Sequence, residues 1–189
     1  MIASVNRHEF AWNWPTKGPV WPPPGSEAAC WAGNEVEFSA LPFLGVFKEA
    51  QHSGQKLTLH AGEWAGADNV YEALETFNTD RIGHGVRMME NPNTVALARE
   101  SGLAFEVVVT SNYQTGVVKS ILEHPFMEML NGGLNLAIGT DNPSILRVPL
   151  TDEYHLIFGK TWKWSTNSSK NASWRQDTPV FCRKPITMN

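Results

Sequence analysis

Four side chains that can bind a metal ion or carry a proton, His60, Glu63, His84 and Asp141, follow short apolar segments and stand close to glycine residues. Tight turns at the ends of β-strands present metal ligands and proton carriers in this way. His60, His84 and Asp141 are too far apart in the sequence for one loop to hold them. Only a tertiary fold can therefore gather them into one site.

The apolar segments that precede these residues predict β-strands, and helical patterns lie between them. Strands are expected at residues 56–59, 81–82, 104–109 and 134–138, with two further candidates at residues 1–5 and 28–32. Helices are expected at residues 42–53, from a cap at Asp68 or Asn69 to about residue 77, at residues 92–102 and at residues 125–131. Alternation of this kind indicates parallel βα units, whose chemistry gathers at the carboxyl ends of the strands.

Residues 33–154 resemble the C-terminal part of the adenosine deaminases of the metal-dependent amidohydrolase superfamily. The motifs that carry the resemblance are Gly33-Asn34-Glu35, His60-Ala61-Gly62-Glu63, Arg81 to Gly85, Thr110-Ser111-Asn112 and Thr140-Asp141-Asn142-Pro143. One such motif would be weak, but the ordered set is specific. The resemblance implies a (β/α)8 barrel. At 189 residues the chain is shorter than the roughly 250 of a full barrel, so we expect an α/β fold with about five to six of the eight strands.

The resemblance also implies one zinc ion or similar divalent metal and the hydrolytic deamination of adenosine. His60 and Asp141 match metal ligands, and Asp141 also matches the group that orients the attacking water. Glu63 matches the acid that protonates N1 of the purine. His84 matches the histidine that holds the hydroxide while charge develops.

Two further residues match positions that contact the purine. Gly33 matches a glycine whose backbone approaches the ring, where a side chain would clash. Asn142 stands where the family usually has an aspartate placed to hydrogen-bond N7 of the purine, and an amide can donate that hydrogen bond at any pH. We interpret His8, His52, His124 and His155 as surface or packing residues.

The sequence departs from the family in ways that leave two hypotheses open. The His-x-His pair that supplies two further metal ligands is absent, and prolines interrupt residues 10–30, where the family has a helix and a strand. Residues 160–189 also diverge. One hypothesis is a zinc-dependent purine-nucleoside deaminase, with adenine, adenosine monophosphate or modified adenosines as alternative substrates. The other is an inactive remnant from a truncated or frame-disrupted gene, or a half-barrel that needs a complementing partner.

Composition bounds the remaining expectations. A hydrophobic content of 42% in 189 residues favours a single domain over residues 1–189. The net charge of −4 gives no basic surface for nucleic acid, and no membrane-spanning run or signal peptide is visible, so we expect a cytoplasmic protein. The expected partner is a small-molecule purine. Open barrel edges would also favour self-association.

Overall fold

One parallel sheet organises the part of the chain that the structure describes. The structure is a computed structural model, and it describes residues 2–6 and 28–159. Its six strands are β1 (Ile2–Asn6), β2 (Ala28–Ala32), β3 (Lys56–Ala61), β4 (Arg81–His84), β5 (Ala104–Val107) and β6 (Asn135–Ile138). They pair in sequence order, each parallel to the next. This order is that of successive βα units, and both candidate strands at the N-terminal end, residues 1–5 and 28–32, are confirmed.

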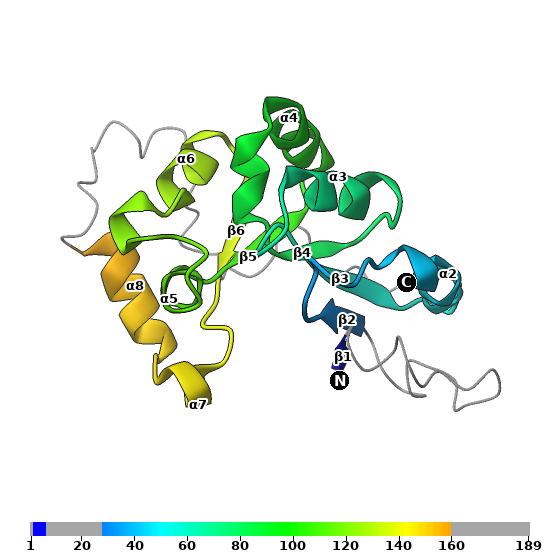
Figure 1. Cartoon of the computed structure of the whole chain (residues 1–189), viewed down its shortest axis with the longest axis horizontal. Coiled ribbons are helices and arrows are strands. Elements are labelled where there is room, and N and C mark those ends of the chain that lie inside the picture. Colours follow the sequence, from blue (N-terminus) through cyan, green and yellow to red (C-terminus); the bar gives the residue numbers. More distant parts are fainter. Residues whose placement is uncertain (1, 7–27, 160–189) are drawn as a thin grey trace.

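Helices connect the strands. The α-helices are α2 (Leu44–His52), α3 (Ala67–Glu75), α4 (Pro92–Ser101), α5 (Val109–Gln114), α6 (Phe126–Asn131), α7 (Pro143–Leu146) and α8 (Leu150–Phe158). In the described part of the chain, 3-10 helices lie at η1 (Leu41–Phe43), η2 (Val86–Glu90) and η3 (Ile121–Glu123). Along one face of the sheet, α2, α3, α4 and α6 follow one another in chain order (Figure 1).

The two faces of the sheet have different side chains because residues alternate along each strand. Leu57, Leu59, Ile82, Phe105 and Ile138 are buried members of the hydrophobic core, together with apolar side chains of the helices. Residues between them in the strands point to the opposite, inner face, and these include His60, Arg81 and Glu106. The helix-covered face therefore stabilises the fold, and the inner face carries the polar groups.

The sequence patterns predicted α4 accurately because its ends have strong local signals. Asn91 caps the helix by accepting a hydrogen bond from the backbone N–H of Asn93, Pro92 occupies its first position, and Gly102 ends it in a left-handed conformation. The predicted cap of α3 at Asp68 or Asn69 is wrong. Gly66 caps that helix, and both polar residues lie within its first turn.

A second difference lies after β5. The predicted strand 104–109 ends at Val107, and Val109 already belongs to α5. This turn is set by a long-range contact, because the buried carboxylate of Glu153 accepts hydrogen bonds from the backbone N–H groups of Val109 and Thr110. Glu153 lies in α8, a helix that local patterns did not predict. A contact across more than 40 residues leaves no local signal.

The architecture is α/β, with six strands of a barrel-type βα arrangement. Within residues 2–6 and 28–159 the sheet ends at β1 on one side and β6 on the other. The divergent segments, residues 10–30 and 160–189, fall almost entirely outside the described residues, and the single-domain assignment stays a prediction. None of the described helices has the length and apolar character needed to cross a membrane.

Candidate active site

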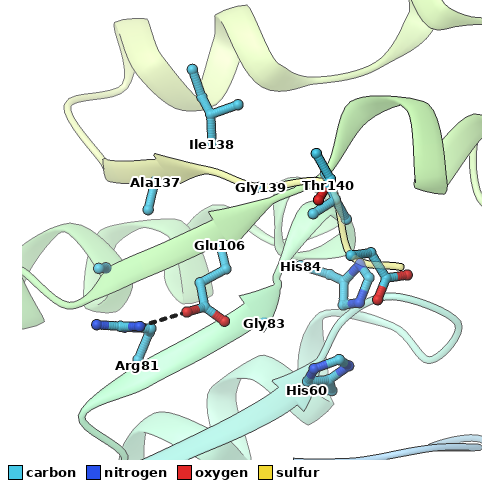
Figure 2. A pocket seen from close by; sticks show the side chains of 12 residues that line it. His60, Arg81, Gly83, His84, Glu106, Ala137, Ile138, Gly139 and Thr140 are labelled. Carbon is cyan, nitrogen blue, oxygen red and sulfur yellow. Dashed lines mark hydrogen bonds and ion pairs between the residues drawn. The ribbon is translucent and has the colours of Figure 1, made fainter. Parts of the chain in front are cut away.

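A cavity of about 350 Å³ opens on the inner face of the sheet and extends along β4 and β5 to the carboxyl ends of β3, β4 and β6. His60, His84 and Asp141 line it together, although they come from three different βα units. Figure 2 shows the imidazoles of His60 and His84 close to one another. To their left in Figure 2 an ion pair joins Arg81 and Glu106, with Nη1 and Oε1 at 2.7 Å. The tertiary fold thus gathers the separated polar residues, as the sequence pattern predicted.

Sheet register explains the position of His60. In the parallel pairing His60 lies beside Gly83, and Gly83 lies beside Glu106, so all three face the cavity. A Cβ atom on Gly83 would lie 2.6 Å from Cδ2 of His60. The glycine is therefore required at this position, because its missing side chain leaves the space that the imidazole of His60 occupies.

His84 and Asp141 both adopt left-handed backbone conformations, with φ of 64° and 59°. Such conformations are uncommon for residues other than glycine and store strain that the surrounding structure must hold. Asp141 is held by two donors. Ser111 Oγ donates to its Oδ2 at 2.8 Å, and Asn142 Nδ2 donates to its Oδ1 at 3.2 Å. These bonds orient the Asp141 carboxylate at the cavity.

Glu63 is positioned by a second carboxylate. Glu35 is buried, and it accepts hydrogen bonds from the backbone N–H groups of Gly62 at 2.9 Å and Ala65 at 2.8 Å, and from that of Trp64. These three bonds clamp the turn that follows β3 on both sides of Glu63. The Glu63 side chain consequently reaches His84, where Oε2 lies 3.3 Å from Nε2.

The protonation states of this pair follow from burial. Removal from water, with added repulsion from Asp141 and Glu35, raises the pKa of Glu63 to about 7. Burial, followed by the neighbouring imidazoles of His60 and His124, lowers the pKa of His84 to about 3. Glu63 can therefore hold and release a proton near neutral pH, while His84 stays neutral.

The donor atoms suit a divalent metal. Ligand atoms of His60, Glu63 and His84 all lie within 4.8 Å of one another, and Asp141 lines the same cavity without belonging to that group. Imidazole nitrogens and carboxylate oxygens are the ligands that zinc takes in catalytic sites, which commonly have three protein ligands. His60 and Asp141 are donors of these types and fit a zinc-type ion. With Glu63 and His84 in the acid and hydrogen-bonding roles that the sequence predicts, these two are one protein ligand fewer than such sites commonly have.

The two remaining predicted residues lie at the rim. Gly33 has a φ of 106°, which favours glycine, and it lines a neighbouring cavity of about 530 Å³ with Glu63 and Trp64. Asn142 is exposed and makes its described contact with Asp141. Contact of either residue with a purine stays a prediction.

Four residues that the structure places in the site were not predicted as site residues from the sequence. Glu35, Ser111 and Asn112 belong to motifs that carried the resemblance, and that was the available signal for them. His124 had none and was interpreted as a surface or packing residue. It is buried, and its Nε2 lies 3.1 Å from Oδ1 of Asn112, whose Nδ2 lies 3.1 Å from Nδ1 of His84.

Comparison with known proteins agrees with this geometry. The family model described as adenosine deaminase matches residues 28–174. The chain belongs to the adenosine deaminase family. A curated adenosine deaminase of Enterococcus faecalis is 41% identical over 131 residues, which are 69% of this chain and 38% of that protein. One of Erwinia tasmaniensis is 37% identical over 125 residues, which are 66% of this chain and 38% of that protein. The chain thus spans well under half the length of these adenosine deaminases.

Solved structures support the fold. An amidohydrolase from Burkhoderia ambifaria, determined with bound Zn, superposes with a TM-score of 0.72 at 22% identity, over 90% of this chain and 48% of the other. At this level of identity the likeness shows the fold alone: the sheet of this adenosine deaminase family member matches about half of a larger α/β structure. It confirms the predicted fold class, an α/β partial barrel.

Proposed function

We propose that this chain carries the catalytic half of a zinc-dependent deaminase that hydrolyses adenosine to inosine and ammonia. The observation that carries the proposal is the position of Glu63. Its carboxyl group has a pKa of about 7 and lies 3.3 Å from Nε2 of His84, and His84 lines a cavity together with His60 and Asp141. A carboxylic acid that is half protonated near neutral pH suits the protonation of a ring nitrogen.

Two residues would hold the metal. His60 and Asp141 supply an imidazole nitrogen and a carboxylate oxygen from the same cavity, which supports their assignment as ligands. Bound zinc lowers the pKa of water towards about 7 and so makes hydroxide available at neutral pH. Asp141, fixed by Ser111 and Asn142, is oriented to accept a proton from the attacking water and to direct it.

Two residues would act on the substrate. Glu63 donates its proton to N1 of the purine, so that carbon 6 accepts the oxygen nucleophile without a full negative charge on the ring. His84 is neutral and donates a hydrogen bond from Nε2 as charge develops. The left-handed backbone of His84 and Asp141 holds both side chains at the strand ends.

Gly33 and Asn142 would set substrate binding. Gly33 lines the cavity next to Glu63, where the missing side chain leaves space for a flat ring. The amide of Asn142 carries two N–H groups, so one can bind Asp141 while the other donates to N7. These contacts recognise the aminopurine, and adenine or modified adenosines share them. None of these contacts involves the ribose.

The test is ammonia release from adenosine by the zinc-loaded chain, with metal content measured on the same sample. Glu63→Gln keeps the shape of the side chain but removes the titrating proton, so turnover should be lost while zinc is retained. Glu100→Gln is the matched control, because Glu100 is exposed on α4 and lines neither cavity. Equal turnover of wild type and Glu63→Gln would refute the assigned acid.

A second candidate is a half-barrel that works only when another polypeptide completes it. In the described part of the chain the sheet ends at β1 and β6, and an uncovered strand edge recruits other chains. Light scattering of the purified chain tests this candidate. Oligomers, and ammonia release that rises more steeply than protein concentration, would support it, whereas a monomer with full activity would exclude it.

A further inference from the structure

A continuous series of hydrogen bonds leads from the backbone to His84. The backbone N–H of Phe126 donates to Nδ1 of His124 at 3.0 Å. His124 Nε2 lies 3.1 Å from Oδ1 of Asn112, and Asn112 Nδ2 lies 3.1 Å from Nδ1 of His84. All three side chains are buried, at 3% exposure for His124, 0% for Asn112 and 2% for His84.

The backbone group fixes the direction of the whole series, because an amide N–H can only donate. Nδ1 of His124 must accept, so a neutral His124 carries its proton on Nε2 and donates to Asn112. Burial lowers the pKa of His124 to about 4 and so keeps it neutral. The amide of Asn112 then has its oxygen towards His124 and its NH₂ group towards His84.

Nδ1 of His84 therefore accepts a hydrogen bond, and the proton of the neutral ring resides on Nε2. That nitrogen lies 3.3 Å from Oε2 of Glu63. Since Nε2 already carries a proton, it can donate to Glu63 but cannot take the proton of Glu63. With the opposite tautomer, Nε2 would accept, and the Glu63 proton would be held by His84.

We propose that Asn112 and His124 are positioning residues that hold His84 as the Nε2–H tautomer and thereby keep the proton of Glu63 available to the substrate. The functional importance of the Glu63 proton rests on the proposed deamination. The assignment of the His84 tautomer is independent of that function, because it follows from the hydrogen bonds alone.

The surroundings of Asn112 are built to keep the series in place. Glu153 holds the start of α5 through the N–H groups of Val109 and Thr110, and the next residue, Ser111, binds Asp141. Asn112 thus sits on a helix that is fixed at both the Glu153 side and the cavity side. His124 is fixed by the first backbone N–H of α6, so each end of the series is attached to secondary structure.

The direct test is ¹⁵N NMR of the histidine rings in the full chain near pH 7.5. The ¹⁵N shifts and the two-bond proton couplings distinguish a protonated from an unprotonated ring nitrogen. Wild-type His84 is expected to have a protonated Nε2 and an unprotonated Nδ1. The opposite tautomer in the wild type would overturn the proposal without any variant.

Variants then test what sets the tautomer. In Asn112→Asp a carboxylate faces Nδ1 of His84 and can only accept, so Nδ1 should become protonated. His124→Phe frees the amide of Asn112 to rotate, and the preference for Nε2–H should weaken. His124→Gln offers an acceptor and a donor in similar positions and should restore it. His155→Gln, on the exposed side of α8, is the control.

Kinetics connect the tautomer to function. Asn112→Asp should lower kcat by roughly 10- to 100-fold with little change in KM, as for other partners that orient a reacting group. An unchanged His84 tautomer in Asn112→Asp would overturn the proposal. A chain with the expected tautomers that releases no ammonia would refute the proposed deamination and still support the assigned role of Asn112 and His124.

Discussion

His84 Nε2 and Glu63 Oε2 lie 3.3 Å apart, yet these two groups do not form an ion pair at neutral pH. Burial raises the pKa of Glu63 to about 7 and lowers that of His84 to about 3, so His84 is neutral and Glu63 is half protonated. The contact is a hydrogen bond between two side chains that are largely removed from water. It places a proton that can be released near pH 7 next to the cavity.

The first prediction concerns the pH dependence of turnover. If Glu63 donates a proton in the rate-limiting step, kcat should be constant below about pH 7 and should fall roughly tenfold per unit above it, because the acid is then ionised. A pH–rate profile of ammonia release measures this. A kcat that rises through pH 7 would show that Glu63 acts as a base.

The second prediction tests the raised pKa of Glu63 through the stability of the fold, without a measurement of catalysis. Because the folded-state pKa of Glu63 is raised from 4.5 to about 7, its contribution to stability is fully present below pH 4.5 and is lost as pH rises to about 7. The loss is on the order of 3 kcal/mol. Glu63→Gln cannot ionise, so its stability relative to wild type should increase with pH across this window.

Denaturant unfolding of the zinc-free chain at pH 5 and pH 8 measures the difference. Glu100→Gln, on the exposed side of α4, is the control and should show a constant difference. If Glu63→Gln behaves like Glu100→Gln at both pH values, the carboxyl group has an ordinary pKa and the proposed acid loses its support.

Much of this site could be predicted from local signals, because His60, His84 and Asp141 each follow a strand whose apolar residues are plain in the sequence. The prediction failed where a contact spans many residues. Glu153 binds the first backbone N–H groups of α5, which lie 43 and 44 residues before it in the sequence. Glu35 binds the turn that contains Glu63, which lies 27 to 30 residues after it. His124 shares no motif with His84, and only the fold places Asn112 between them.

The third prediction concerns the space that Gly83 leaves for His60. In Gly83→Ala the new Cβ would lie 2.6 Å from the imidazole, so His60 must move. Zinc affinity should fall by roughly 10- to 100-fold, as when the support of a metal ligand is lost. Zinc titration against a chelator measures it. Gly45→Ala is the matched control, because nothing lies within 4 Å of a Cβ at that position.

The fourth prediction concerns Glu35. In Glu35→Gln one carboxylate oxygen becomes an NH₂ group, which cannot accept the backbone N–H groups of Gly62, Trp64 and Ala65. At least one buried N–H loses its partner, at a cost of about 1–3 kcal/mol. Hydrogen exchange of residues 62–65 should accelerate. Glu37→Gln removes the same charge from an exposed position and should leave that exchange unchanged.

The last prediction concerns Asn142, which donates to Asp141 and has a second N–H for N7 of a purine. In Asn142→Asp the side chain can donate to N7 only when protonated, and a carboxylate beside Asp141 repels it when ionised. Purine nucleoside binding by the variant should therefore weaken as pH rises from 5 to 8, relative to wild type. Because Glu63 titrates in both proteins, its effect on binding drops out of the ratio of their affinities.

Calorimetry with zinc-loaded protein and inosine, a product that is not turned over, measures both affinities. Asn142→Gln is the control for side-chain position, because it keeps the amide but moves it by one methylene. If the ratio of the two affinities is constant between pH 5 and pH 8, residue 142 does not donate to the purine. The role of Asn142 would then be limited to orienting Asp141, which the 3.2 Å contact already provides.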